Sequence, residues 1–418
     1  MAIVTAGPQA LDTRTLSTAA WSSLTVTTRT SSYALGDERC LGAPGTKLEF
    51  WGSGLTYDAA GRLASGKVFA VQESVGGQVT WRLDNLQLQA KTLLAWASAG
   101  TLAQNGLGGN DSLTGTAAAD WLHGHAGHDS IAAGAGADTI TGGIGNDLID
   151  GGAGNDTAIL SGRLADYRLV SWNGTVGVVG RTPAARAADG IDELRQVETI
   201  SFAASGESIA APAANFAPLA YVASYLDLSL LLGANPMAGF KHMLQYGAAE
   251  GRTTTFSGAE YIASYRDLMQ AFGSNAEAGA QHFIQHGRTE GRHASFSGLE
   301  YIASYADLIA TLHADREAGA RQYIEHGRAE GRHESFNGLL YIASQRDLIP
   351  TLGADADAGA EQYILHGHAE GRQVTFNAKQ YVANYADLKA AFGSDVDAAA
   401  THFILHGAYE GRTDAPLL

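Results

Sequence analysis

The spacing of apolar residues changes along the chain and divides it into parts with different predicted structure. From Leu24 to about Ala97 apolar and polar positions tend to alternate, and Gly76-Gly77 marks a turn. Such alternation is typical of strands that bury one face, so we predict a small antiparallel β domain over residues 21–104, with some helix near residues 86–96. Residues 1–20 have little pattern and are predicted to be a mobile leader.

Six consecutive nine-residue units fill residues 106–159. Each carries an aspartate at position six and an apolar residue at position eight. The aspartates are Asp111, Asp120, Asp129, Asp138, Asp147 and Asp156. The apolar residues are Leu113, Leu122, Ile131, Ile140, Ile149 and Ala158. The stretch holds seven aspartates and no lysine, arginine or glutamate, so it is expected to bind cations. A flexible Gly/Asp-rich linker is the alternative, but a linker has no reason to place an apolar residue at every ninth position.

Glycines at positions one, two and four permit left-handed turns and leave carbonyl oxygens bare. A three-residue strand follows each turn, and stacking alternate units places each aspartate roughly 4.7 Å from the one eighteen residues later. Paired carboxylates and turn carbonyls make an all-oxygen cage, which calcium prefers. Asp129 with Asp147 and Asp138 with Asp156 are the best pairs, because His125, Ala133 and residues 116–118 replace glycines elsewhere. Besides the six aspartates, the predicted calcium-site residues are Gly127, Gly136, Gly143, Gly145, Asn146, Gly152, Gly154 and Asn155.

These units resemble the nonapeptide repeat GGxGxDxUx of RTX proteins, which form a parallel β-roll with calcium between successive turns. The resemblance implies Ca²⁺ as the cofactor. It also implies export from a Gram-negative bacterium by the type I secretion machinery, with folding in external calcium.

Residues 161–212 are predicted to continue as β structure and to cap the roll. Asn173-Gly174 is a strong two-residue hairpin turn. The segment from Asp189 to Phe202 resembles DGTDTLxNVExLxF, which often closes a β-roll in this family. Asp189 and Asp192 either hold one more ion or serve the turn.

A period of 40 residues fills the last half of the chain and begins at Phe216, Phe256, Phe296, Phe336 and Phe376. Each unit reads as two helices. In the second unit, one helix starts with a capping box of Ser257 and Glu260 and stops at Gly273. The other helix is capped by Asn275, whose counterparts are Asn235, Asp315, Asp355 and Asp395. Neighbouring pairs are expected to stack into a helical array over residues 213–418.

These units resemble YxxxxxDL…HYxxHGxxEGR repeats of secreted and surface proteins of alphaproteobacteria, which implies an architecture and not an activity. Asp267 and its equivalents are predicted to contact an arginine of an adjacent unit. The recurrent His286, His326, His366 and His406 are read as helix-end residues and not as metal ligands, because Tyr246 takes that place in the first unit. The predicted fold is therefore multidomain β plus α: a small N-terminal β domain, a parallel β-roll over 105–160 with its β cap, and the array with two helices per 40 residues.

Composition narrows the class of partner. The 418 residues carry a net charge of -16, which argues against nucleic acid or an anionic membrane surface as a partner. The single Cys40 allows no internal disulfide. The first residues lack the pattern of a Sec signal peptide, and no apolar stretch is long enough for a transmembrane helix, so membrane insertion is not expected.

Enzyme signatures such as HExxH, GxSxG and GxxxxGK[ST] are missing, so a non-enzymatic protein is expected. The favoured function is an extracellular or outer-surface protein of a Gram-negative bacterium, of the surface-layer, biofilm-matrix or adhesin type, that binds calcium and either self-assembles or binds a surface glycan or protein. The alternative is a secreted hydrolase or glycan-active enzyme with its site in the N-terminal β domain. The aromatic residues there, for which core packing is favoured over a glycan platform, are Trp21, Phe50, Trp51, Tyr57 and Trp81.

Overall fold

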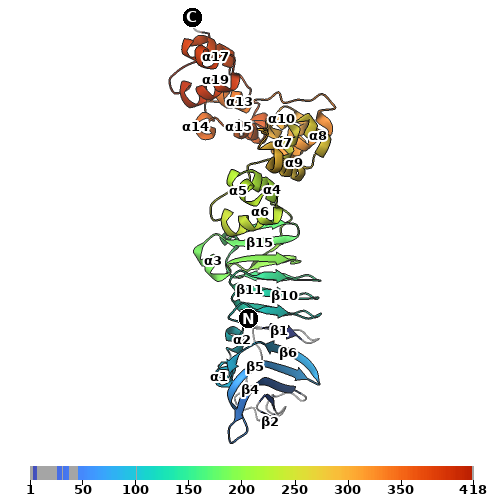
Figure 1. Ribbon diagram of the computed structural model, residues 1–418. Helices are drawn as coiled ribbons and strands as arrows, with labels where there is room; N and C mark the ends of the chain where they lie inside the picture. The colour runs from blue at the N-terminus through green and yellow to red at the C-terminus, as the bar shows by residue number, and fades with distance from the viewer. Residues whose placement is uncertain (1–2, 7–25, 31, 37–45, 100, 417–418) are drawn as a thin grey trace. The chain divides into compact units, whose positions relative to one another are not determined.

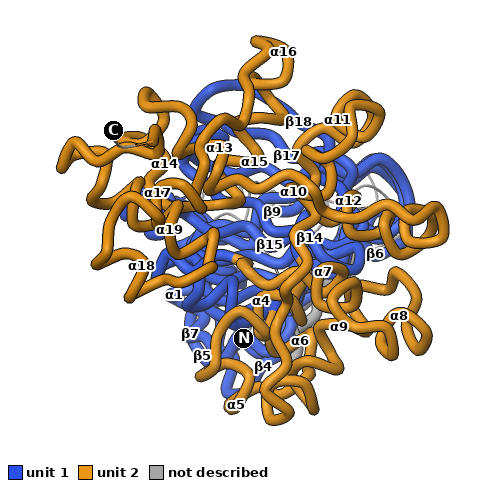
Figure 2. Tube along the Cα trace, turned by 90° about the horizontal axis from the view of Figure 1, so that it is seen from above, with its two compact units in different colours: residues 1–216, 240–253 blue, residues 217–239, 254–418 orange. Residues whose placement is uncertain are grey.

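The computed structural model describes residues 3–6, 26–30, 32–36, 46–99 and 101–416. These residues form two compact units, which Figure 2 colours separately. The first contains Met1–Phe216 and Phe240–Thr253, and the second contains Ala217–Gly239 and Thr254–Leu418. Trp21, Leu24 and Cys40 lie outside the described residues, so the predictions made for them concern a part of the chain that the structure leaves out.

The first unit begins with antiparallel strands in the order β1-β6-β5-β4-β3-β2, with helix α1 against β5. Phe50 and Trp81 are buried in the core with Leu48, Leu83 and Leu93, which agrees with the prediction that these two aromatic residues pack in the core. The elements are β1 (Ile3–Ala6), β2 (Val26–Arg29), β3 (Tyr33–Gly36), β4 (Thr46–Tyr57), β5 (Leu63–Val75), β6 (Gln78–Asp84), β7 (Leu88–Gln89), α1 (Ala90–Ser98) and α2 (Leu102–Gly106).

Strand β1 joins this sheet to the roll that follows. It pairs with β6 in antiparallel fashion and with β8 in parallel, where Ile3 lies opposite Ser112. For Ile3–Ala6 the prediction of a mobile leader is wrong, because a short β-branched segment with Val4 fully buried completes the sheet between two domains.

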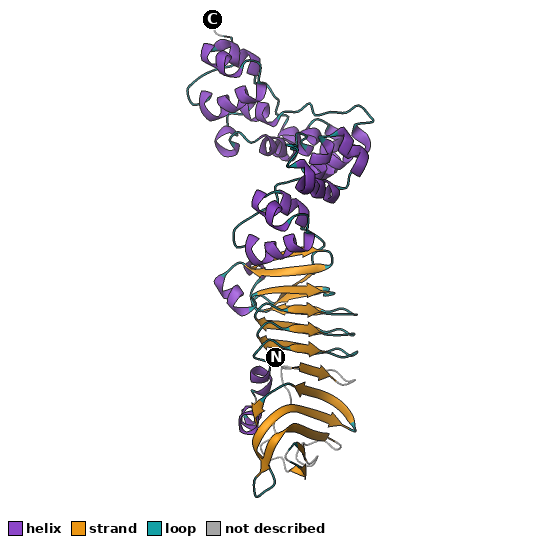
Figure 3. Cartoon of the chain, viewed as in Figure 1, coloured by secondary structure: helices purple, strands orange, loops and turns teal. Residues whose placement is uncertain are grey.

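The nonapeptide units form a parallel β-roll. Strands β8, β10 and β12 lie in one sheet and β9, β11 and β13 in the other, and neighbours in each sheet pair with a register of eighteen residues, as Ser112↔Ser130↔Leu148 shows. Figure 3 shows these strands as successive rungs. Their position-eight side chains are at most 1% exposed and fill the space between the sheets. The strands are β8 (Ser112–Thr114), β9 (Trp121–Ala126), β10 (Ser130–Ala132), β11 (Thr139–Ile144), β12 (Leu148–Asp150) and β13 (Thr157–Leu160).

The cap extends both sheets of the roll. Strand β16 pairs in parallel with β12, and β17 pairs in parallel with β13. Antiparallel strands β15 and β18 then cover the two new edges. Asn173 and Gly174 form the predicted hairpin turn, with φ angles of 49° and 73°. The elements are η3 (Leu164–Asp166), β14 (Tyr167–Trp172), β15 (Thr175–Gly180), α3 (Pro183–Ala188), β16 (Ile191–Arg195), β17 (Thr199–Phe202) and β18 (Glu207–Ala210).

Helices fill the second unit and the adjoining part of the first 40-residue repeat (Figure 1). Phe240–Thr253 belong to the first unit, where the ring of Phe240 lies 5.6 Å from that of Trp172. The α-helices are α4 (Pro218–Ala223), α5 (Leu226–Leu232), α6 (Pro236–His242), α7 (Gly258–Ala263), α8 (Arg266–Phe272), α9 (Ala276–His282), α10 (Gly298–Ala303), α11 (Ala306–Leu312), α12 (Arg316–Gln322), α13 (Gly338–Ser344), α14 (Ile349–Leu352), α15 (Ala356–Gln362), α16 (His368–Glu370), α17 (Ala378–Asn384), α18 (Ala386–Phe392) and α19 (Val396–His402). The π-helical turns are η4 (Met243–Gly247), η5 (Phe283–Gly287), η6 (Tyr323–Gly327), η7 (Tyr363–Gly367) and η8 (Phe403–Gly407).

The prediction of a helical array is confirmed, but the count of two helices per repeat is wrong. The first predicted helix is broken at Tyr265, whose extended backbone (φ -134°, ψ 124°) separates α7 from α8. The side chains explain the break. The Ser264 hydroxyl accepts the N–H groups of Ser295 and Phe296, and the Tyr265 hydroxyl donates to the carbonyl of His293. Both residues therefore bind the chain that enters the next repeat.

The capping prediction holds in part. The hydroxyl of Ser257 accepts the N–H of Glu260, and Asn275 accepts the N–H of Ala278. The carboxylate of Glu260 does not complete a capping box, because it accepts the N–H of Gly298 in the next repeat at 2.8 Å.

Asp267 does bind Arg292, at 2.8 Å, but the two residues belong to one repeat and not to adjacent repeats. The turn after η5 folds the Glu-Gly-Arg end of the repeat back toward its own α8. Within the described part of the chain, no helix has both the length and the apolar character needed to cross a bilayer.

Candidate calcium site

The position-six aspartates form two ladders, one along each edge of the roll. The N–H of Asp111 donates to Oδ1 of Asp129, and the N–H of Asp129 donates to Oδ1 of Asp147, at 2.7 and 2.8 Å. On the other edge Asp120 and Asp138 donate in the same way to Asp138 and Asp156, at 2.7 and 2.9 Å. All six carboxylates are at most 3% exposed. The structure therefore brings together the six aspartates in pairs eighteen residues apart.

The second carboxylate oxygen is left over in four of the six. Oδ2 is buried and has no hydrogen-bond partner among the described residues in Asp129, Asp138, Asp147 and Asp156. A buried carboxylate oxygen without a partner is costly, because it has lost its water and gained nothing in return. These four oxygens are therefore suited to a cation.

The glycines make the turns close enough for this arrangement. Gly127, Gly136, Gly143, Gly145, Gly152 and Gly154 all have φ angles between +89° and +150°. A Cβ on Gly145 would lie 1.6 Å from the carbonyl oxygen of Gly127, and one on Gly124 would lie 2.3 Å from Oδ2 of Asp129 and 2.6 Å from the carbonyl oxygen of Gly142. Only glycine fits there, and the turns place main-chain oxygens beside the unpartnered carboxylate oxygens.

Burial dominates the electrostatics of the ladders. It raises the pKa of Asp129 to about 7 and that of Asp147 to about 6, against the lowering effect of the N–H donors of Asp111 and Asp129. The pKa values of Asp138 and Asp156 are raised by burial as well. The charge of a neighbouring carboxylate adds to the rise at each of these sites. A cation between the carboxylates would reverse this tendency, because it favours their charged form.

Some predicted site residues lie apart from these oxygens. Asn155 is exposed, and Asn146 uses its side-chain oxygen to accept the N–H of Ile191 at 2.9 Å. Asp120 differs from the four aspartates above, because Thr116 supplies an N–H at 2.6 Å and a hydroxyl at 3.0 Å to its Oδ2. Thr116 occupies position two of its nonapeptide unit, where the repeat has a glycine. The sequence did not predict that Thr116 would donate hydrogen bonds to Oδ2 of Asp120.

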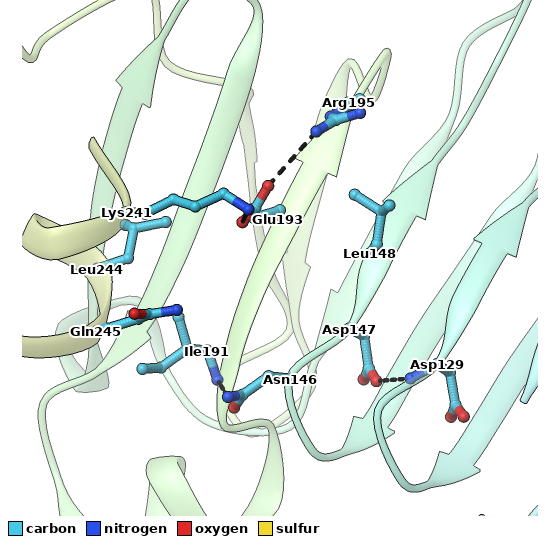
Figure 4. A pocket seen from close by; sticks show the side chains of 10 residues that line it. All are labelled: Asp129, Asn146, Asp147, Leu148, Ile191, Glu193, Arg195, Lys241, Leu244 and Gln245. Atoms are coloured by element: carbon cyan, nitrogen blue, oxygen red, sulfur yellow. Dashed lines mark hydrogen bonds and ion pairs between the residues drawn. The ribbon is translucent and has the colours of Figure 1, made fainter. Parts of the chain in front are cut away.

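Residues outside the nonapeptide units continue both ladders, and the periodicity could not reveal them. Oδ1 of Asp192 accepts the N–H of Asp147 at 2.9 Å, and Oε2 of Glu198 accepts the N–H of Asp156 at 2.8 Å. Figure 4 shows the last turns of the roll, with Asp147 reaching the backbone of Asp129 and Asn146 bound to Ile191. The sequence had already raised Asp192 as a possible ion ligand, from the resemblance of residues 189–202 to the segment that closes a β-roll, whereas Glu198 was not foreseen.

The chemistry of the donors fits a hard cation. In the described part of the chain, no three His, Cys, Asp or Glu side chains converge as a metal cluster, so an ion in the ladders would need main-chain carbonyls in addition to the aspartates. Carboxylate and carbonyl oxygens in flexible numbers suit calcium, whereas zinc and copper prefer nitrogen and sulfur.

Comparison with known proteins agrees with this chemistry. A model of the RTX calcium-binding nonapeptide repeat, in four copies, matches residues 105–140 and 126–158. The chain matches none of the curated proteins. Among solved structures, the extracellular lipase LipA from Serratia marcescens is similar at 22% identity and a TM-score of 0.12. That similarity covers 22% of this chain and only 13% of the lipase, and it carries no argument about activity. Residues 105–158 are an RTX repeat region, and RTX nonapeptide repeats bind calcium.

Proposed function

We propose that this chain is a secreted, non-enzymatic protein of the outer cell surface or its surroundings, in which the roll folds when it meets external calcium. The observation that carries the proposal is the set of four buried carboxylate oxygens, in Asp129, Asp138, Asp147 and Asp156, that lack a partner in the described part of the chain. Their burial is unfavourable until a cation joins them, so folding of the roll and binding of calcium are coupled.

This coupling suits export by type I secretion. In a cytosol poor in calcium, neighbouring aspartates repel each other and hold the roll open, which keeps the chain in a form that can be threaded through a narrow channel. Outside the cell, calcium neutralises the facing carboxylates. The chain of hydrogen bonds from Asp111 through Asp129 to Asp147 then closes one turn after another.

The helical repeats supply the surface for a partner. On α5 the side chains of Leu226, Leu230 and Leu231 are 55%, 78% and 76% exposed. Leucines exposed to this degree on one short helix favour contact with another molecule, and such contacts suit a surface-layer, matrix or adhesin role.

The test compares the purified full chain in chelator and in millimolar calcium. Far-ultraviolet circular dichroism is expected to gain strand signal with calcium, and the melting temperature is expected to rise with calcium concentration. The variant Asp129→Asn is expected to need more calcium for the same change, whereas Asp58→Asn, which alters a turn of the N-terminal domain, is expected to leave the calcium midpoint as it is. Identical spectra and melting in both conditions would contradict calcium-dependent folding. Turnover in a screen of ester, glycoside and peptide substrates would contradict the non-enzymatic role.

A further inference from the structure

The cap supplies both ladders with one more rung. Asp192 accepts the N–H of Asp147 as Asp147 accepts that of Asp129, at 2.9 and 2.8 Å. The sequence distance is 45 residues in the first case and 18 in the second. Glu198 plays the same part for Asp156, across 42 residues. The geometry of the ladder is therefore kept where the nonapeptide spacing is lost.

We propose that the cap completes two further calcium sites, one between Asp147 and Asp192 and one between Asp156 and Glu198. Asp192 and Glu198 lie beyond the residues that the RTX repeat model covers. The inference rests on the calcium binding proposed above and extends it to strands β16 and β17. Both sites contain a buried oxygen without a partner: Oδ2 of Asp147 and Oδ2 of Asp156 accept no hydrogen bond from any residue that the structure describes, and these two residues are 3% and 0% exposed.

Main-chain oxygens approach these positions as they do within the roll. A Cβ on Gly190 would lie 1.8 Å from the carbonyl oxygen of Gly145, which repeats the contact of Gly145 with Gly127. A Cβ on Gly151 would lie 2.2 Å from the carbonyl oxygen of Gln196 and 2.7 Å from Oδ2 of Asp156. The carbonyl of Gln196 thus stands where the roll places a carbonyl of the next nonapeptide unit, as Gly142 does beside Gly124 and Asp129.

Asp189 is not part of the site, although it lies three residues before Asp192. Its Oδ2 accepts hydrogen bonds from the hydroxyl groups of Tyr167 and Ser161, so it holds the cap to the end of β13. Asp189 and Asp192 therefore have different roles. Asp192 belongs to the ladder, and Asp189 belongs to the turn.

Calcium at these positions would fasten the cap to the roll. The segment between the last nonapeptide unit and Asp192 contains the β14–β15 hairpin and α3, so the chain leaves the roll and returns to it at β16. Because β16 pairs with β12 and β17 with β13, ions at the two junctions would hold these strands of the cap against the last strands of the roll.

The experiment counts bound ions by native mass spectrometry of the full chain in calcium, for the wild type, Asp192→Asn and Glu198→Gln. Both substitutions keep an oxygen that can accept the N–H of Asp147 or Asp156, so the hydrogen bond is retained and only the charge is lost. Glu193→Gln is the matched control, because Glu193 lies in the same strand as Asp192 but faces Arg195 and Lys241. Each cap variant is expected to bind one ion fewer than the wild type, and the control is expected to bind the full number.

Hydrogen exchange is expected to become faster over residues 191–202 in each cap variant, while residues 129–150 stay protected.

Equal ion counts in the wild type, Asp192→Asn and Glu198→Gln would overturn the cap sites while leaving calcium binding by the roll intact. A wild-type chain that binds no calcium would instead overturn the proposed function. If a cap variant fails to fold, the wild type decides the question by hydrogen exchange during a calcium titration. Protection of residues 191–202 must then rise with calcium, and protection that does not respond to calcium overturns the proposal.

Discussion

Glu260 and Arg316 form an ion pair between consecutive helical repeats, with Oε2 of the glutamate 3.0 Å from Nη2 of the arginine. The glutamate is buried, and its other oxygen accepts the N–H of Gly298 at 2.8 Å. The arginine is partly exposed and also pairs with Asp357 at 2.7 Å. A carboxylate that the sequence suggested as a local helix cap is therefore a link between repeats.

Replacing Glu260 by alanine should loosen this link. The N–H of Gly298 would lose its acceptor in a buried place, and Arg316 would lose Glu260 while it keeps its ion pair with Asp357. We expect the free energy of unfolding of the helical repeats to fall by about 1–3 kcal/mol, measured by urea denaturation. Glu290→Ala is the control, because Glu290 is exposed and pairs with Arg292 inside its own repeat. Equal effects of the two substitutions would contradict a special role for Glu260.

Ser304 is a second link between repeats. Its hydroxyl oxygen accepts the N–H groups of Ser335 and Phe336 at 2.8 and 2.9 Å. Ser304→Ala removes the acceptor of both donors, which are exposed or part-buried, and we expect a loss of about 0.5–1.5 kcal/mol in the free energy of unfolding. Ser335→Ala keeps its backbone N–H and changes only an exposed side chain, so its thermal stability should match the wild type. A stable Ser304→Ala chain would show that water replaces the hydroxyl at no cost.

The close contact of Gly145 with Gly127 should not tolerate a side chain. At Gly145 an added Cβ meets the carbonyl oxygen of Gly127 at 1.6 Å, whereas at Gly206 it meets nothing within 4 Å, although both glycines have positive φ. Gly206→Ala should therefore cost only the left-handed strain of about 1–2 kcal/mol. Gly145→Ala should cost about 1–3 kcal/mol more through overpacking. It should also raise the calcium concentration needed to fold the roll, as circular dichroism would reveal. Equal calcium midpoints for the two variants would argue against tight stacking of the turns.

Glu334 should make the helical repeats less stable as pH rises. Burial raises its pKa from 4.5 to about 7 against the hydrogen bond from the N–H of Ser297, and the charges of Glu300 and Glu260 add to the rise. Because the folded pKa is the higher one, protonation favours the folded state. This stability is fully present below about pH 4 and is lost as pH rises through about 7.

The measurement is the melting temperature of wild type and Glu334→Gln between pH 4 and 8. The wild type should lose stability relative to the variant as pH rises, because glutamine does not ionise. Glu330→Gln alters an exposed glutamate that pairs with Arg332 and should follow the wild type. A constant difference between wild type and Glu334→Gln at all pH values would mean that Glu334 has an ordinary pKa.

Much of the site could be predicted because it repeats. The position-six aspartates and position-eight apolar residues recur at nine-residue intervals, so the eighteen-residue register between Asp129 and Asp147 followed from strand geometry. Asp192 and Glu198 could not be placed in the same way. Their rungs depend on a hairpin and a short helix that return the chain to the roll, and no spacing rule states where such an excursion ends.

The sequence by itself determined the order of the architecture, the register of the roll, the helix caps such as Asn275, and the choice of calcium, because each follows from local periodicity or from donor chemistry. Only the tertiary structure decided that Tyr265 breaks a helix, that Glu260 binds the next repeat, that Asp267 binds Arg292 within its own repeat, and that β1 joins two domains. The physical reason is that a side chain with several possible partners takes the one that folding brings nearest. That distance depends on the whole chain and not on the neighbouring residues.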